Sequence, residues 1–221
     1  MIRAVVFDMD GVLIDSEHVW DEVREQLAHE RGGRWHPGAQ QAMMGMSSPE
    51  WSLYMRDVIG LPGSPAEINA EVVARLLARY RKSLPLIDGA VEAVRRLAAS
   101  FPLAVASSSN RPLIDAVLAR SEIVDLFEVT VSSEEVERGK PAPDVYLEAT
   151  RRLGFPPAHC AAIEDSANGI RSAHAAGLRV CAVPNAHYPP SADALALADI
   201  VLPSVAALTA ATLSEAMSGK S

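Results

Sequence analysis

The sequence predicts an α/β fold in which helices cover a parallel sheet and a helical segment is inserted after the first strand. From about residue 88 onward, short apolar, β-branched runs alternate with helix-period runs, a pattern typical of right-handed βαβ units. The strand-like runs are apolar throughout, as expected for strands buried on both faces. Between residues 16 and 85, in contrast, helical patterns follow one another with no strand between them.

The first strand is predicted at residues 2–7, where an apolar, β-branched run stops abruptly at Asp8. Runs of the same kind recur after the inserted segment, and each is short enough for one strand. They lie at residues 103–106, 128–131, 160–163, 180–183 and 200–202.

Helices are predicted between these later strands, because apolar residues recur there at intervals of three and four. Ser166 is expected to cap the helix that follows the 160–163 strand, and Gly177 to end it. The small, polar tail from Thr209 to Ser221 is expected to fray at its end. The apolar stripes are Val91, Val94, Leu97 and Ala98; Leu113, Ile114, Val117 and Leu118; Val145, Tyr146, Ala149 and Leu153; and Ala167, Ile170 and Ala173.

The inserted segment is predicted to be an α-helical domain of residues 16–85, and the core to comprise residues 1–15 and 86–221. The plainer alternative is that the inserted helices are simply further core helices. Two amphipathic stripes predict these helices. They are Trp20, Val23 and Leu27, and Ile68, Val72, Val73, Leu76, Leu77 and Tyr80.

Composition excludes several classes of protein. The 20 Lys and Arg against 28 Asp and Glu give a formal net charge of −8, which argues against a nucleic-acid partner, since a phosphate backbone requires clustered cations. Two cysteines are too few for a zinc knuckle or a disulfide framework. No apolar run reaches the roughly 18 residues of a membrane span. We therefore expect no membrane partner, a cytoplasmic location, and a monomer rather than an oligomer.

Acidic residues follow two of the predicted strands, where ligands of open α/β sheets bind. Asp8 and Asp10 come directly after the first strand, and Glu164 and Asp165 follow the 160–163 strand. Adjacent acids at such a place are poor packing material and suit a metal ion. Two neighbouring carboxylates repel each other unless a cation lies between them or one of them holds a proton.

Residues suited to anionic oxygens follow other strands. Ser107 and Ser108 stand at a strand-to-helix turn, where hydroxyls and backbone N–H groups suit an anion, although ordinary helix capping explains single serines as well. Lys140 lies in a loop stiffened by Pro141 and Pro143. A lysine in such a loop loses less entropy when its ammonium is held in place, although most lysines are solvated surface charges.

Four sequence strings, taken in order, resemble the four motifs of the haloacid dehalogenase-like superfamily. They are DMDGVLIDS, VASSSN, GKPAPDVY and IEDSANGI, each after a predicted strand. The resemblance covers the whole chain. It implies a Rossmann-like parallel-sheet core with an α-helical cap inserted just after the first motif, in agreement with the pattern of strands and helices.

The resemblance also implies a phosphatase-type site acting on a small-molecule phosphate monoester. Asp8 would be the nucleophile that forms an aspartyl-phosphate. Asp10 would protonate the leaving oxygen and later deprotonate the attacking water. The implied ligands of Mg²⁺ are Asp8, the backbone carbonyl of Asp10, Asp165 and Glu164, and the implied phosphate-binding residues are Ser107, Ser108 and Lys140.

Asp10 also indicates a branch of the superfamily. Its ATPases carry Thr at this position and its dehalogenases lack the acid, so the chain resembles phosphatases and phosphomutases, specifically the β-phosphoglucomutase-like group. The mutases there carry a His five residues after the position of Asp15 and an Arg after a Gly-hydrophobic-Ser turn. Here those features are Trp20 and a turn, Gly45–Ser48, without Arg. We therefore expect a sugar- or polyol-phosphate phosphatase, with a phosphomutase as the alternative.

Trp20, Ser47 and His18 are the cap residues expected to contact the substrate. Trp20 would give a platform for the C–H face of a sugar, and its packing inside the cap is the equal alternative. The cations from Arg75 to Lys82 are expected to form a solvated face. A non-enzymatic binding module is the alternative class, and it is disfavoured because every position named by the resemblance carries the expected residue type.

Overall fold

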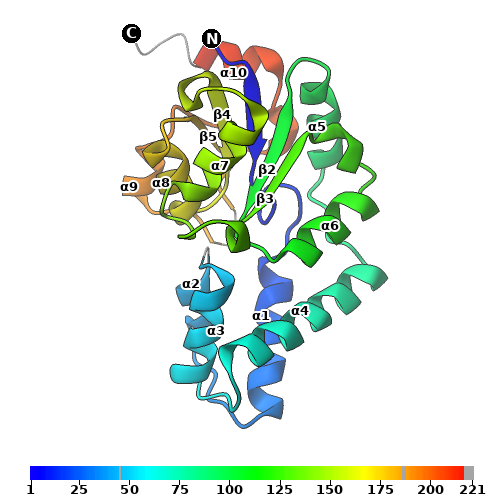
Figure 1. Cartoon of the computed structure of the whole chain (residues 1–221), viewed down its shortest axis with the longest axis vertical. Helices are drawn as coiled ribbons and strands as arrows, with labels where there is room; N and C mark the ends of the chain where they lie inside the picture. Colours follow the sequence, from blue (N-terminus) through cyan, green and yellow to red (C-terminus); the bar gives the residue numbers. More distant parts are fainter. Residues whose placement is uncertain (45, 186–187, 217–221) are drawn as a thin grey trace.

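A computed structural model describes residues 1–44, 46–185 and 188–216. Within these residues the strands form one parallel sheet in the order β3-β2-β1-β4-β5-β6, which confirms the predicted α/β class (Figure 1). All six predicted strands are found, with ends shifted by a few residues. They are β1 (Ala4–Phe7), β2 (Leu103–Ser107), β3 (Val129–Ser132), β4 (Cys160–Glu164), β5 (Arg179–Ala182) and β6 (Ile200–Val201).

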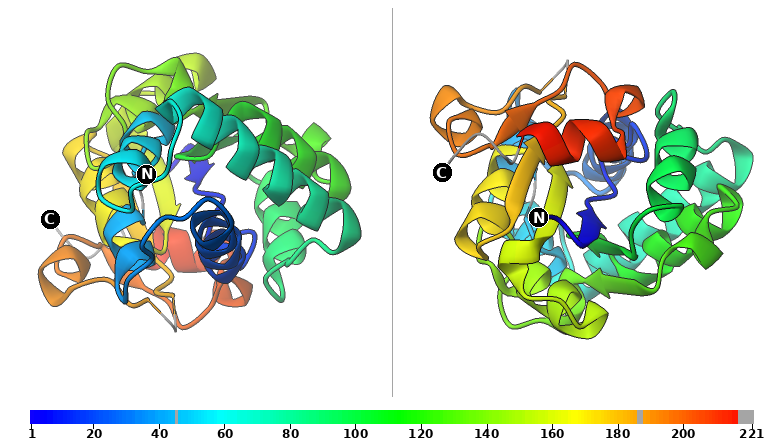
Figure 2. Two further views of the ribbon diagram at one scale, coloured as in Figure 1. Left: turned by 90° about the horizontal axis from the view of Figure 1, so that it is seen from below. Right: turned by 90° about the horizontal axis from the view of Figure 1, so that it is seen from above.

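Helices cover both faces of this sheet, because alternate residues of each strand point to opposite sides. Val5 and Phe7 belong to the apolar cluster on one face, and Ala4 and Val6 to the cluster on the other. Figure 2 looks along the strands and shows helices on both sides of them. The first cluster includes α5 (Ala90–Ala98), α6 (Arg111–Arg120) and α10 (Ala210–Ala216), and the second includes α7 (Asp144–Leu153), α8 (Ala167–Ala175) and α9 (Ala192–Leu195).

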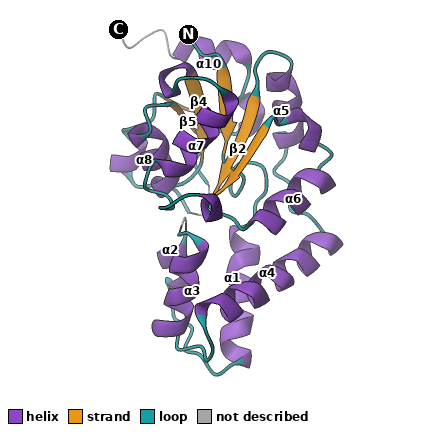
Figure 3. Cartoon of the chain, in the orientation of Figure 1, coloured by secondary structure: helices purple, strands orange, loops and turns teal. Residues whose placement is uncertain are grey.

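Four helices lie together beyond the carboxyl ends of the strands, at the end of the molecule away from the N-terminus (Figures 1 and 3). Two of them contain the predicted stripes. The other two are too short for a clear period in the sequence, yet they contribute the buried side chains of Met43, Trp51 and Met55. The four are α1 (Glu17–Glu30), α2 (Ala39–Met43), α3 (Ser48–Asp57) and α4 (Pro65–Lys82). None of the described helices is long and apolar enough to cross a membrane.

The two chain segments that join these helices to the sheet run side by side. The Asp15 amide donates to the Pro85 carbonyl at 2.8 Å, and the Ile87 amide donates to the Leu13 carbonyl at 3.0 Å. A further contact joins α4 to the loop after β2, because the Asn110 amide nitrogen donates to Asn69 at 3.2 Å. Helices α1 to α4, called the cap below, therefore meet the sheet at several points.

The C-terminal segment contains a helix that the sequence pattern did not predict. Residues 210–216 form α10, and Leu213 is fully buried against the sheet. A single leucine among small residues anchors this helix, which is why the sequence showed no periodic stripe. Residues 217–221, where fraying was expected, lie outside the described part of the chain.

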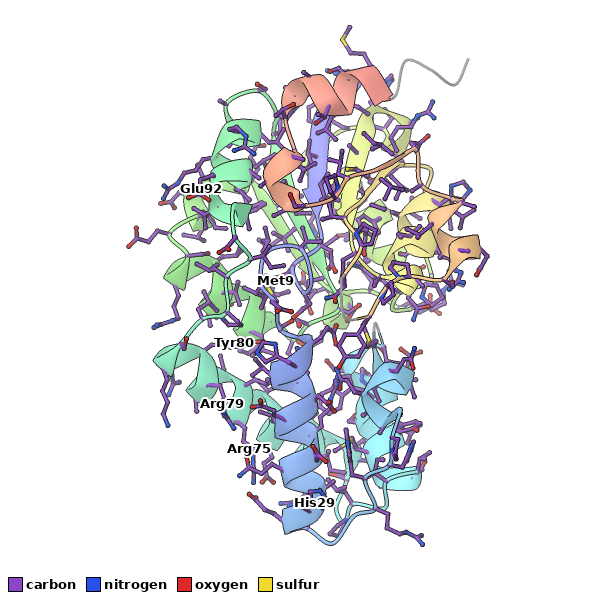
Figure 4. The ribbon with its side chains drawn as sticks, turned by 180° about the vertical axis from the view of Figure 1, so that it is seen from behind. Met9, His29, Arg75, Arg79, Tyr80 and Glu92 are labelled. Atoms are coloured by element: carbon purple, nitrogen blue, oxygen red, sulfur yellow. The ribbon has the colours of Figure 1, made fainter. Side chains whose placement is uncertain are left out.

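The cations of α4 lie mainly on the outside of the cap, as expected. Arg75 donates to Glu30 at 2.6 Å and to Glu71 at 2.7 Å, and Arg79 lies 3.4 Å from Glu22. Figure 4 shows both arginines directed from α4 toward α1. They tie the two helices together at their solvent-exposed surface, where such pairs each contribute little to stability.

Candidate active site

The acidic residues predicted from the sequence meet at the carboxyl ends of two neighbouring strands. Strands β1 and β4 pair with Phe7 opposite Ile163, so the residues that follow these positions emerge side by side. Asp8, Glu164 and Asp165 are all buried, and one carboxylate oxygen of each lies within 4.8 Å of the others. Three carboxylates so close together require compensating positive charge.

Lys140 supplies part of that charge. It is only 3% exposed, and its Nζ donates to Asp8 Oδ1 at 2.9 Å and to Glu164 Oε1 at 2.6 Å. Tyr146, on α7, donates to the same Glu164 oxygen at 2.8 Å, and its ring centroid lies 5.0 Å from the ammonium. Glu164 thus holds the lysine in place beside Asp8.

Glu164 is fixed from its other side as well. Its second oxygen accepts hydrogen bonds from the backbone amides of Asp165 and Ser166, at 3.1 and 3.3 Å, and from the Ser166 hydroxyl at 3.2 Å. Ser166 Oγ in turn accepts from the amide of Gly169 at 3.1 Å. Ser166 is therefore the N-cap of α8, as predicted. The cap of this helix and the orientation of Lys140 therefore depend on one local network.

Two glycines make room for these carboxylates. A methyl group added at Gly11 would lie 1.8 Å from Asp165 Oδ2, and one added at Gly169 would lie 1.8 Å from Glu164 Oε1. Neither position accepts a side chain without displacing an acid. The glycines of the DMDG and SANG strings are therefore part of the site, although they carry no chemistry of their own.

The charge balance of the site fits a hard cation. Burial, together with Glu164 and Asp10, raises the pKa of Asp8 to about 8, and Lys140 opposes this rise. Burial and the neighbouring acids Glu164 and Asp8 also raise the pKa of Asp165 well above its ordinary value. One ammonium against three buried carboxyl groups leaves negative charge uncompensated. Carboxylate oxygens at these separations are the donors that hard divalent cations bind.

Asp10 lies at the same edge of the sheet but makes different contacts. Its Oδ1 accepts from the Ser16 hydroxyl at 2.5 Å and from Trp20 Nε1 at 3.4 Å, and its Oδ2 accepts from the Ser109 hydroxyl at 2.7 Å. Both oxygens are therefore held by neutral donors instead of a lysine.

Asp10 also opens onto a pocket between cap and core. The volume is about 40 Å³, which is room for about three water molecules. The lining residues are Asp10, Glu17, Trp20, Arg24, Met43, Met44, Met46, Trp51, Ser108 and Ser109.

Comparison with known proteins decides the family. The model of the haloacid dehalogenase-like hydrolases matches residues 2–177. The chain is a haloacid dehalogenase-like hydrolase. Hexitol phosphatase B of Escherichia coli (strain K12) is 35% identical to it over 219 residues, which cover 96% of each chain. Protein CbbY of Rhodobacter capsulatus is 32% identical over 226 residues, covering 97% of this chain and 98% of the relative.

Solved structures agree with this assignment. The crystal structure of CbbY from Rhodobacter sphaeroides in complex with phosphate matches with a TM-score of 0.84 at 28% identity, covering 97% of this chain and 100% of the other. The predicted resemblance to the sugar-phosphate phosphatase branch is thus confirmed, and with it the Rossmann-like core and the presence of a cap. The hydrolase is a phosphoric monoester hydrolase.

The predicted site residues of the hydrolase fall into three groups. The first group is the acidic cluster with its lysine. Carboxylate oxygens of Asp8, Glu164 and Asp165 lie within 4.8 Å of one another, and Lys140 bonds to Asp8 and Glu164. Ser107 is fully buried at the end of β2, and its Oγ accepts from the Ser109 amide at 3.0 Å. The third group lines the cap pocket and comprises Asp10, Ser108 and Trp20.

Two of the predicted cap contacts lie elsewhere in the hydrolase. The His18 side chain is 54% exposed and lies 3.9 Å from Asp15, outside the pocket lining. Ser47 forms the N-terminal capping box of α3 with Glu50 and packs against Gly139 of the core. The mutase-related turn that precedes it includes Gly45, which lies outside the described residues.

Several residues that contact the acidic cluster or line the pocket were not singled out in the sequence. Tyr146 was assigned only to an apolar helix stripe, although it lies six residues beyond Lys140. Glu17 and Arg24 line the pocket from the inward face of α1, seven residues apart. Spacing of seven places two residues on one helix face, and this was the available signal. Trp51 gave no such signal, because α3 itself was not predicted.

Proposed function

We propose that this phosphatase hydrolyses a small sugar or polyol phosphate through an aspartyl-phosphate on Asp8, with Mg²⁺ as cofactor. The observation that carries the proposal is the contact between Asp8 and Lys140 beside two further buried acids, with Asp10 held separately by neutral donors. Two carboxyl groups placed in such different surroundings suit two different chemical tasks.

In the first step, an Asp8 oxygen attacks the phosphorus atom. A bond forms between that oxygen and phosphorus, and the bond from phosphorus to the substrate's ester oxygen breaks. Asp10 donates its proton to the departing oxygen, so the product leaves as a neutral alcohol. Lys140 Nζ, already 2.9 Å from Asp8 Oδ1, stabilises the negative charge of the phosphoryl oxygens during the transfer.

In the second step, Asp10 acts as a base. It takes a proton from a water molecule whose oxygen attacks phosphorus, the bond between Asp8 and phosphorus breaks, and inorganic phosphate is released. Asp10 is thereby protonated again and Asp8 is again a carboxylate. Ser16 and Ser109 orient both oxygens of Asp10 for the two proton transfers.

The residues that would hold Mg²⁺ are Asp8, Asp165 and the backbone carbonyl of Asp10, with Glu164 behind them. When bound, the ion supplies positive charge against the phosphoryl oxygens. The fully buried Glu164 uses one oxygen for Lys140 and Tyr146 and the other for backbone amides. It therefore acts mainly by fixing Lys140, and its contribution to the metal site is secondary.

The substrate class rests on the relatives and on the pocket. One relative, hexitol phosphatase B, is named for a polyol phosphate. A further relative, 32% identical over 181 residues, is named for fructose 1-phosphate. The pocket beside Asp10 is lined by polar and apolar groups of the cap, which is the composition that a hydroxylated carbon chain requires. We therefore favour a sugar or polyol phosphate.

Phosphate release from a panel of monoesters tests the proposal. We expect turnover of sugar and polyol phosphates with Mg²⁺, loss of turnover with a chelator, and a loss of at least about 10⁴-fold in kcat for Asp8→Asn. Asp88→Asn, in the exposed loop before α5, is the matched control. Activity that survives Asp8→Asn would exclude the aspartyl-phosphate mechanism.

The phosphomutase alternative requires a separate measurement. Trp20 stands where mutases carry a histidine, and its indole nitrogen faces Asp10. We expect inorganic phosphate to be released from a hexose 1-phosphate without prior accumulation of the 6-phosphate. Isomerisation that is faster than phosphate release would favour the mutase.

A further inference from the structure

A buried arginine in the cap has no role in the mechanism described above. Arg24 lies on α1, is 4% exposed, and lines the same pocket as Asp10. Its guanidinium carbon lies 4.4 Å from the ring centroid of Trp20 and 4.7 Å from that of Trp51. The two indole rings are themselves in edge contact at 5.8 Å. Both tryptophans thus hold the arginine in one orientation.

The hydrogen bonds of Arg24 are incomplete. Nη1 donates to Gln40 Oε1 at 3.1 Å, while Nε has no hydrogen-bond partner among the described residues. A guanidinium group has five N–H donors in a fixed plane. Burial lowers the pKa of Arg24 to about 10, even though Glu17 and Asp10 oppose this change. A charged group kept in such a place destabilises the fold, and a buried donor without a partner, on a residue that lines the pocket, points to a ligand.

Gln40 connects the arginine to an acid. Its Nε2 donates to Glu17 Oε2 at 2.7 Å and to the Glu17 carbonyl at 3.3 Å, while its Oε1 accepts from Arg24. The side chains of Glu17 and Arg24 are therefore held at a fixed separation on the pocket wall. Glu17 offers acceptor oxygens, and Arg24 offers N–H donors.

We propose that Arg24 determines substrate specificity by donating hydrogen bonds to hydroxyl oxygens in the organic part of the substrate, opposite its phosphate. The proposal rests on the proposed function, since Asp8 and Lys140 fix the phosphate end. A hydroxyl group can accept from Arg24 and donate to Glu17 at the same time. A carboxylate or phosphate in that place could accept from Arg24 but has no hydrogen to donate to Glu17.

This assignment also changes the role expected for Trp20. The guanidinium of Arg24 lies over its ring, so at least part of that ring is not available as a platform for a sugar. Trp20 and Trp51 are positioning residues for the arginine. Substrate specificity in the cap then depends on the polar groups of Arg24 and Glu17, and the two tryptophans hold the arginine in place.

Discrimination between two esters tests the proposal. We would measure kcat and KM with a hexitol 6-phosphate, which has a hydroxylated chain, and with p-nitrophenyl phosphate, which has none. For Arg24→Met we expect the ratio of the two kcat/KM values to fall by about 10- to 100-fold, the effect of losing one or two hydrogen bonds to a charged donor. The change should fall mostly on KM. Arg75→Met, on the outside of the cap, is the matched control and should leave the ratio unchanged.

Arg24→Lys guards against misfolding, because it retains the charge and most of the stem but lacks the planar fork. It should lower the ratio as well. An equal loss with both esters, or no loss with either, would overturn the proposal. So would a larger loss with 6-phosphogluconate, which carries an anionic end, than with the hexitol ester. A failure of the proposed function is distinct, since the unmodified protein would then hydrolyse neither ester.

Discussion

The two halves of the site, one in the core and one in the cap, are built on opposite principles. In the core, Lys140 lies within 2.9 Å of each of its acidic partners, and the surrounding hydrogen bonds involve both oxygens of Glu164. In the cap, Arg24 is equally buried but has one hydrogen-bonded neighbour among the described residues, Gln40, and an unpartnered Nε. The core cation bonds directly to two acids, and in this sense it is saturated, whereas the cap cation bonds only to a neutral amide.

This difference separates chemistry from recognition. A saturated network is rigid, and rigidity at the phosphate end benefits a transfer reaction that depends on positioning. Unfilled donors are costly in the folded state, and they persist where a ligand completes them. The same fold thus keeps a fixed reactive end and a selective end, and specificity can change in the cap without disturbing the acids of the core.

Removing the core cation should have the largest effect. Lys140→Met leaves Asp8 and Glu164 buried without the ammonium group that bonds to both, and Asp8 then holds its proton more tightly and loses nucleophilicity. We expect kcat to fall by about 10³-fold and the free energy of unfolding to fall by about 3 kcal/mol or more, as measured by phosphate release and urea denaturation. Lys82→Met, at the exposed end of α4, is the control. A stable, active Lys140→Met variant would refute the saturated-network description.

Crowding the core network without changing its charge should have a smaller effect. Alanine ordinarily stabilises a helix by about 1 kcal/mol relative to glycine, but at Gly169 its methyl group would lie 1.8 Å from Glu164 Oε1. We expect Gly169→Ala to lose about 2 kcal/mol of stability and about tenfold or more in kcat. The exposed His174→Ala, on the same helix, controls for helix propensity. A gain in melting temperature for Gly169→Ala would show that Glu164 is free to move.

The core site was predictable from the sequence and the cap pocket was not, for a physical reason. Asp8, Lys140 and Asp165 follow strands of one parallel sheet, and the topology of such a sheet brings strand ends together whatever the details of packing. The position of Arg24 beside the pocket depends on its contact with Trp51. Trp51 lies on α3, a helix too short to show a period in the sequence. The burial of Arg24 depends on how α1, α2 and α3 pack. A sequence pattern treats arginine as a polar residue and therefore does not predict that Arg24 is buried.

The contact between core and cap allows a test of intermediate size. A methyl group added at Gly139 would lie 2.8 Å from Cβ of Ser47, at the start of α3, so Gly139→Ala should hold the cap slightly away from the core. We expect kcat/KM to fall by about tenfold with little change in melting temperature. The double variant Gly139→Ala, Ser47→Gly removes the clash and should recover most of the activity, since glycine is a tolerated N-cap residue. No recovery would mean that the loss arises within the Lys140 loop.

The smallest effect concerns the acid of the cap pocket. Burial, with Asp10, raises the pKa of Glu17 from 4.5 to about 7, and Arg24 and Gln40 only partly oppose the rise. A carboxyl group with a raised pKa in the folded state favours folding while it is protonated, so its contribution is lost as the pH rises from about 4.5 to about 7.

Glu17→Gln cannot ionise and should therefore be more stable than the unmodified protein at pH 8, but not at pH 5. Because Glu17 is only half-buried, we expect a difference of about 1 to 2 kcal/mol, or a few degrees in melting temperature. Glu92→Gln, on an exposed helix face of the core (Figure 4), should show no such pH-dependent gain. If Glu17→Gln is equally stable relative to the unmodified protein at both pH values, then Arg24 already compensates Glu17 fully. In that case the cap cation is as saturated as the core cation, and the contrast between the two halves of the site disappears.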